Sequence, residues 1–166
     1  LWIEEPHLPT KQFLAYFRYL AECNEIELLI KLRPYDIGQK NTFLDELRAV
    51  GLLENIAISS ILSGDIFEAL CHVDTVVASH STVILDALAW NVKVALFETK
   101  NWGDYFDLKN LAIHQELIAQ KPSQLLAMIL APAEQAQQLF KAHYIDQENR
   151  DGADWAVSKL MGYINE

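Results

Sequence analysis

The sequence predicts an α/β domain with a parallel sheet flanked by helices on both faces, and two observations carry this prediction. Short apolar runs alternate with segments of helical periodicity along the chain, an order typical of βαβ units with right-handed crossovers. The runs, such as IELLIKL at 26–32, are nearly continuous in apolar residues, because parallel strands are buried on both faces. We therefore expect a Rossmann-like fold, built as a single domain over residues 1–166.

Each element follows from its own pattern. Pro and Thr suit the first positions of a helix, Asp65 with Glu68 three residues later resembles a capping box, and Asn91 suits a left-handed position after a helix. The expected strands are 1–3, 26–32, 56–58, 75–78 and 92–97. The expected helices begin at residues 9 or 10, 41 or 42, 66, 83 and 123; the last is interrupted at Pro132 and resumes to about Tyr144, and a further helix follows Gly152.

Composition narrows the class of protein. The chain carries a formal net charge of −10, which argues against a nucleic-acid surface and against docking on an anionic leaflet. No apolar run reaches the ~18 residues that a spanning helix needs, so we expect a cytoplasmic protein without a direct membrane span. Cys23 and Cys71 form no CxxC pair, and we expect buried, reduced thiols and no metal site. The chain opens within a strand, which favours part of a longer protein.

Ligands of open α/β sheets bind beyond the carboxyl ends of the strands. The segments 31–36, 59–64, 79–82 and 98–107 meet this rule. In Ser79-His80-Ser81-Thr82 a strand ends, hydroxyls cluster and a helix starts. Unpaired amides and the helix dipole at such a point suit a phosphate. The alternative is that Ser81 or Thr82 only caps the helix, and that His80 is structural.

Charged residues near these segments suit a nucleotide. Asp86 lies one helical turn after Thr82, and its carboxylate suits ribose hydroxyls, unless it is a solvated surface acid. Lys31 and Arg33 alternate with Leu32, so they point to one side of the strand and suit a diphosphate. Salt bridges to acids are the alternative for both cations. Neither GxGxxG nor GxxxxGK[ST] occurs, so ordinary dinucleotide or P-loop binding is not supported.

The segment GDIFEALCHVDTVVASHSTVILDALAWNVKVALFE at 64–98 resembles the donor-site core of GT-B glycosyltransferases. Within that fold it is similar to CDP-glycerol glycerophosphotransferases and capsule glycosyltransferases. Upstream, LIKLRPYD resembles their strand ending in a basic-x-His-Pro motif, and downstream TKNWGDYFDL resembles their acid-plus-tyrosine loop. The segment FKAHYIDQENRDGADWAVSKLMGYI at 140–164 is similar to the final helix of these enzymes and the polar turn before it. The likeness covers roughly residues 26 to 164.

The resemblance implies the C-terminal, donor-binding half of a transferase of surface polysaccharide synthesis, inactive alone. The donor is a nucleotide-activated sugar or a CDP-glycerol-like compound, without cofactor or metal, and the missing N-terminal domain supplies the acceptor site. The full-length protein is then expected at the inner face of a membrane. Arg33 stands where these enzymes have His, and His80 is the candidate for the missing imidazole. Asp86 stands where they have Glu, and its side chain is one methylene shorter. The implied donor-binding residues are Lys31, Arg33, Ser79, His80, Ser81, Thr82, Asp86, Asp104 and Tyr105, with Ser59, Ser60 and Ser63 in a loop that contacts the base.

Two other functions remain open. Non-hydrolysing sugar-nucleotide 2-epimerases resemble the same fold, but their glycine-rich turn before the helix is replaced here by Ser79 to Thr82. A non-enzymatic module that binds a partner protein is the other, and exposed Trp90 and Trp102 are its expected contacts.

Overall fold

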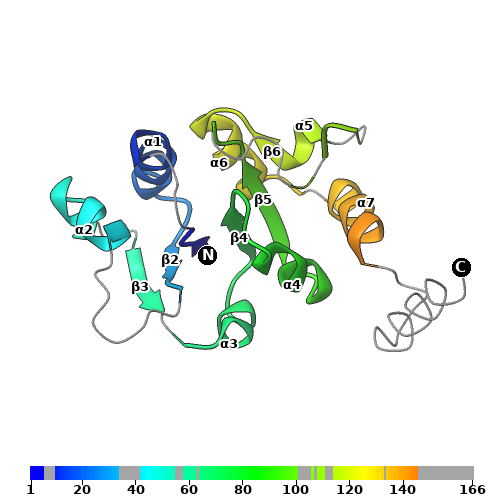
Figure 1. Ribbon diagram of the computed structural model, residues 1–166, viewed down its shortest axis with the longest axis horizontal. Coiled ribbons are helices and arrows are strands. Elements are labelled where there is room, and N and C mark those ends of the chain that lie inside the picture. The colour runs from blue at the N-terminus through cyan, green and yellow to red at the C-terminus, as the bar shows by residue number, and fades with distance from the viewer. Residues whose placement is uncertain are drawn as a thin grey trace, which may run out of the picture.

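The computed structural model describes residues 1–5, 10–33, 42–54, 58–62, 64–100, 106, 108–110, 114–132 and 134–145. Six strands form one sheet (Figure 1), and every pair of neighbouring strands is parallel. The strands are β1 (Trp2–Ile3), β2 (Leu28–Lys31), β3 (Ile58–Leu62), β4 (Thr75–Ala78), β5 (Lys93–Phe97) and β6 (Ile118–Ala119). The predicted α/β, Rossmann-like fold class is confirmed.

The strand order is β3-β2-β1-β4-β5-β6. The chain first builds outward from β1 through β2 to β3, and then returns to the other side of β1 with β4, β5 and β6. Trp2 of β1 is accordingly in register with Ile30 on one side and with Val77 on the other. The neighbours β1 and β4 therefore form the topological switch point, where crevices of open α/β sheets lie.

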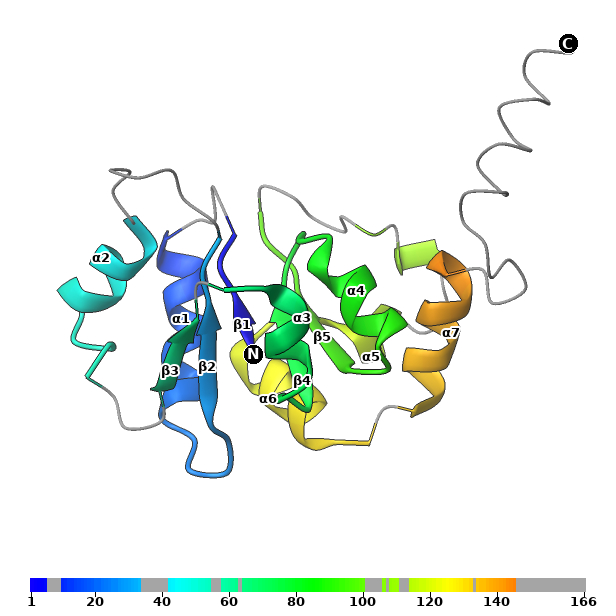
Figure 2. The same cartoon turned by 90° about the horizontal axis from the view of Figure 1, so that it is seen from below.

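Helices cover both faces of the sheet (Figures 1 and 2). Helices α1, α2 and α6 contribute to one buried cluster, with Trp2, Ala95 and Phe97, and helices α3, α4, α5 and α7 contribute to the other, with Ile3, Val94 and Leu96. Successive strand residues point to opposite faces, which explains how β5 fills both clusters. The helices are α1 (Thr10–Ala21), α2 (Thr42–Ala49), α3 (Ile66–Leu70), α4 (Val83–Ala89), α5 (His114–Leu117), α6 (Pro122–Leu130) and α7 (Glu134–Tyr144), with a short 3-10 helix η1 (Leu108–Asn110).

Local signals in the sequence agree with most helix ends. Asp65 is the N-cap of α3, and its carboxylate accepts a hydrogen bond from the Phe67 amide at 2.9 Å. Asn91 follows α4 in the left-handed region with a φ of 60°, as expected of a residue whose short polar side chain tolerates that conformation. The helix predicted after Gly152 lies outside the described residues.

Three expectations are corrected by the structure. The strand predicted at 56–58 is β3, which runs from Ile58 to Leu62. Its pairing with β2 is irregular between Leu28 and Leu29, and such an irregularity disturbs the two-residue periodicity from which a strand is predicted. The short strand β6 was not predicted. Cys71 is exposed rather than buried, because it directly follows the short helix α3. In the described part of the chain, no helix combines the length and apolar character needed to cross a membrane.

Candidate functional site

Buried polar side chains gather where the central strands end. They are Glu4 and Glu5 after β1, Lys31 at the end of β2, Ser79 and His80 after β4, and Thr99 after β5. Carboxylates and ammonium groups are rarely buried unless partners hold them, so their concentration here is informative. This edge of the sheet, around the switch point between β1 and β4, is the candidate functional site.

The carboxylate of Glu5 bridges the switch point. It accepts hydrogen bonds from the backbone amides of Ser79 at 2.8 Å and of His80 at 2.5 Å. The Nδ1 atom of His80 lies 3.6 Å from Oε1 of Glu5. The residue is only 5% exposed, and burial raises the pKa of the Glu5 carboxyl to about 7, against the opposing effect of the amide donors. Glu5 is therefore poised to change its charge close to neutral pH.

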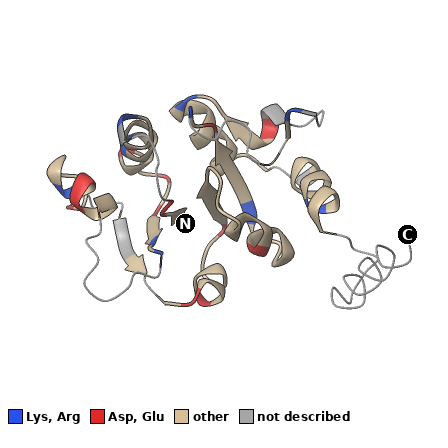
Figure 3. Cartoon of the chain, viewed as in Figure 1, with Lys and Arg blue, Asp and Glu red and all other residues tan. Residues whose placement is uncertain are grey.

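A second set of contacts joins β1 to β2. The Glu4 amide donates to the Lys31 carbonyl at 2.9 Å, and the Glu4 carboxylate accepts from the Arg33 amide at 2.9 Å. The ammonium group of Lys31 donates to the Leu32 carbonyl at 2.7 Å. Burial lowers the pKa of Lys31, while the carboxylates of Asp65 and Glu4 act to raise it. In Figure 3, basic residues in blue and acidic residues in red both occur on the ribbon around β1 and β2.

The predicted Ser79–Thr82 turn lies at this edge, but the amides of Ser79 and His80 are already engaged by Glu5. The Ser79 hydroxyl lies 3.4 Å from that of Thr99, and the Ser81 hydroxyl accepts from the Val83 amide at 3.3 Å. Thr82 is the N-cap of α4 without a side-chain capping bond. The internal carboxylate of Glu5 thus occupies the amide donors of Ser79 and His80 that the sequence suggested for a phosphate.

The other predicted residues differ in their placement. Asp86 is half-buried on α4, and Arg33 is exposed just beyond β2. Ser59 and Ser60 belong to β3 and not to a loop, so the loop expected at these two positions is wrong, while their contact with a base stays a prediction. The pairing of β3 with β2 extends through Leu62. Ser63, Asp104, Tyr105 and Trp102 lie outside the described residues.

Glu4, Glu5 and Thr99 are not among the site residues that the sequence predicts. A usable signal existed, since two acidic residues directly follow the first apolar run. Strand ends in an α/β fold are where such residues meet a ligand site. Thr99 offered no comparable signal, because its burial depends on the packing of the segment after β5.

Helix α1 holds the segment that follows β5. The side chain of Gln12 donates to the Glu98 carbonyl at 2.7 Å and accepts from the Lys100 amide at 3.2 Å. The Glu98 carboxylate also pairs with Lys109 at 2.9 Å. These contacts fix the start of this loop, and Thr99 lies beside Ser79.

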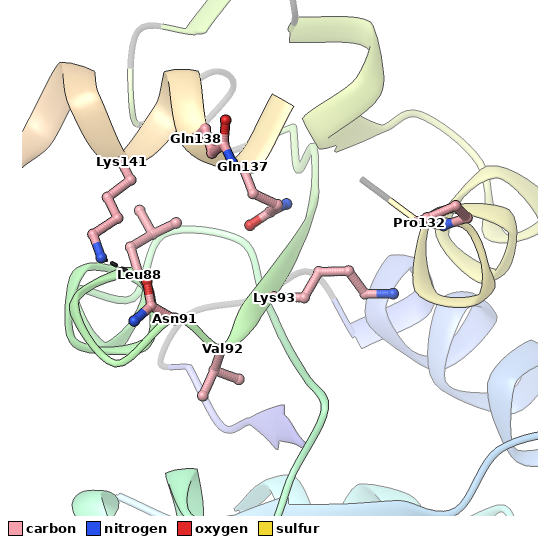
Figure 4. A pocket seen from close by; sticks show the side chains of 8 residues that line it. All are labelled: Leu88, Asn91, Val92, Lys93, Pro132, Gln137, Gln138 and Lys141. Carbon is pink, nitrogen blue, oxygen red and sulfur yellow. Dashed lines mark hydrogen bonds between the residues drawn. The ribbon is translucent and has the colours of Figure 1, made fainter. Parts of the chain in front are cut away.

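A cavity of about 370 Å³ lies away from this edge, at the start of β5. It is lined by Leu88, Asn91, Val92, Lys93, Pro132, Gln137, Gln138 and Lys141 (Figure 4). Lys93 donates to the carbonyls of Ile129 and Ala131 at the end of α6, and Lys141 donates to Asn91 at 2.7 Å. Both ammonium groups hold neighbouring elements together.

Within the described ranges, no group of three or more His, Cys, Asp or Glu residues is arranged to hold a metal ion. Comparison of the chain with protein-family models, with curated proteins and with solved structures gives no significant match.

Proposed function

We propose that this domain binds a nucleotide-activated donor, a sugar or a polyol phosphate, at the carboxyl edge of β1 and β4. In this proposal it is the donor-binding part of a GT-B-type transferase that builds a surface polysaccharide. The observation that carries the proposal is the convergence of buried polar residues on the topological switch point, because doubly wound sheets bind nucleotides there.

The proposed contacts follow from what is available at that edge. Lys31 supplies a cation for the diphosphate, and electrostatic stabilisation of a leaving phosphate is the main task of a transferase of this kind. The hydroxyls of Ser81 and Thr82 add donors, since each can rotate toward a phosphate oxygen. Asp86, one turn along α4, takes the ribose hydroxyls. The amides of Ser79 and His80 take no part, because Glu5 occupies them.

Isothermal titration calorimetry with UDP, CDP, GDP, dTDP and CMP tests the proposal. We expect one nucleotide to bind, and at about 100 times its dissociation constant to stabilise the fold by roughly 2.7 kcal/mol in thermal unfolding. Binding should be lost in Asp86→Ala and strongly weakened in Lys31→Met.

Lys93→Met is the matched control. Burial lowers the pKa of Lys93 as it does that of Lys31, but Lys93 lies at the amino end of β5. Equal loss of binding in both lysine variants would point to a general effect on the fold. Absence of binding for every nucleotide would contradict the proposal.

A further inference from the structure

Two aromatic side chains form an exposed pair on the face of the α3–α4 layer. Phe67 of α3 is 42% exposed and Trp90, the C-cap of α4, is 49% exposed. Their ring centroids are 5.6 Å apart with an interplanar angle of 31°. Exposed apolar residues are ordinary when they are scattered singly, but two large rings in contact make one apolar surface. We call Phe67 and Trp90 the aromatic pair.

The surroundings of the aromatic pair are acidic. Asp65, Glu68 and Asp74 lie in or beside α3, and all three are exposed. No Lys or Arg occurs between Arg48 and Lys93. Cationic groups approach from other elements: Lys31 interacts with Asp65, Lys93 and the amino group of Leu1 interact with Asp74, and the ammonium group of Lys141 donates to Asn91. The α3–α4 surface therefore combines aromatic rings with negative charge.

The negative charge around the aromatic pair favours some classes of partner over others. A second copy of the chain would bring acidic residues against acidic residues in a symmetric contact, because the same patch meets itself. An anionic membrane surface would be repelled for the same reason. A positively charged protein segment is attracted by the acids, and guanidinium groups in particular stack on tryptophan faces.

We propose that the aromatic pair and its acidic surroundings form a docking surface for an arginine-containing segment of a partner protein. Aromatic residues are enriched in the cores of protein interfaces, and tryptophan most often dominates their binding energy. The acids around the pair would speed association and orient the partner. This surface is formed by α3 and the end of α4, so the inference does not rest on nucleotide binding.

The test uses octa-arginine as a probe, titrated into the whole chain by calorimetry at low ionic strength. Trp90→Ala should weaken binding about tenfold, a change of about 1.4 kcal/mol, which is in the range of a desolvated cation–π contact. Phe67→Ala should weaken binding as well. Octa-lysine should bind the unmodified chain less tightly than octa-arginine, because an ammonium group does not stack on the ring as a guanidinium does.

The controls are matched to exposure and charge. Tyr19 of α1, on the opposite layer, is 42% exposed like Phe67, and Tyr19→Ala should leave octa-arginine binding unchanged. Glu68→Gln should weaken the binding of octa-arginine. Glu22→Gln, which removes an exposed charge after α1, should weaken it less, because Glu22 does not adjoin the aromatic pair. Thermal unfolding of each variant verifies that it is folded.

Three results would overturn the inference. The first is equal binding of octa-arginine by the Trp90→Ala and Tyr19→Ala variants, which would show that the net charge of the chain alone explains the binding. The second is a concentration-dependent dimer in sedimentation equilibrium that Trp90→Ala abolishes, which would assign the pair to a second copy. The third is Trp90-dependent binding to phosphatidylserine vesicles, which would assign it to a membrane.

Discussion

At the scale of single residues, Glu5 is under two opposing influences. Its burial disfavours the charged form, while the amides of Ser79 and His80 favour it. The net result is a carboxyl group that is still largely protonated in mildly acidic solution, when an ordinary glutamate has ionised. The contact between β1 and β4 therefore depends on a group whose charge varies in the physiological range.

This pKa shift predicts how stability varies with pH. The usual carboxyl pKa of 4.5 applies to the unfolded chain, and the folded value is about 7. Between these values the folded state holds a proton that the unfolded state has lost, so the Glu5 contribution to stability falls as pH rises from 4.5 to 7. The loss is on the order of 3 kcal/mol if the full shift is realised. Chemical denaturation across this range should show the decline.

The comparison that isolates Glu5 is Glu5→Gln, which removes the titrating group but keeps a single acceptor oxygen, so only one of the two backbone amides retains its partner. We expect a flatter stability profile between pH 4.5 and 7, together with a lower stability at every pH, because one buried backbone amide loses its acceptor. Glu22→Gln, an exposed substitution, should leave the slope unchanged. A slope that is identical in Glu5→Gln and the unmodified chain would show that Glu5 does not titrate there.

At the scale of elements, a side chain completes the edge of the sheet. Strand β6 is in register only with Leu96 and Phe97 of β5, which leaves the start of β5 without a neighbouring strand on that side. The amide group of Gln137 on α7 accepts from the Val94 amide at 2.9 Å and donates to the Val94 carbonyl at 2.7 Å. One glutamine thus reproduces the hydrogen bonds of a paired strand residue.

We expect Gln137→Ala to destabilise the fold by ~1–3 kcal/mol, because it leaves two partly buried backbone groups without partners. The neighbouring Gln138 is exposed on the same helix, and Gln138→Ala should change stability by less than about 0.5 kcal/mol. Urea denaturation measures both. A similar cost for the two substitutions would assign the effect to helix α7 rather than to the Val94 contact.

Some strands and helices could be predicted from the sequence and others could not. Strands β1, β2, β4 and β5 and the ends of α3 and α4 depend on local apolar runs and caps, so they were predictable. The extent of β3 depends on an irregular pairing with β2, and β6 has two residues that are strand only because β5 lies beside them. For the site, Lys31 and Ser79 to Thr82 follow from their strand ends. The role of Glu5 could not be predicted, because its partners are 74 and 75 positions away.

At the scale of the whole molecule, one sheet supports two cores. Leu20 of α1 lies in one buried cluster and Leu88 of α4 in the other, and both are buried almost completely. Because the strands contribute to both clusters, a loss on either face weakens the same sheet. The two layers are therefore expected to unfold together.

We expect Leu20→Ala and Leu88→Ala each to cost about 2–5 kcal/mol. Each variant should retain a single transition at which far-ultraviolet circular dichroism and tryptophan fluorescence change together. Two separated transitions in either variant would contradict the expectation, since they would show that one layer persists after the other has melted.

The central position of β1 also has a consequence for the order in which the molecule assembles. During synthesis, β1 can pair with β2 early, but its other edge stays open until the chain has reached β4, which begins at Thr75, 74 positions after Leu1. Closing a loop of this length carries an entropic cost that local pairs such as β4 with β5 avoid. An unpaired strand edge is a template for pairing with other chains. The nascent protein is therefore most exposed to misassembly in the interval before β4 emerges.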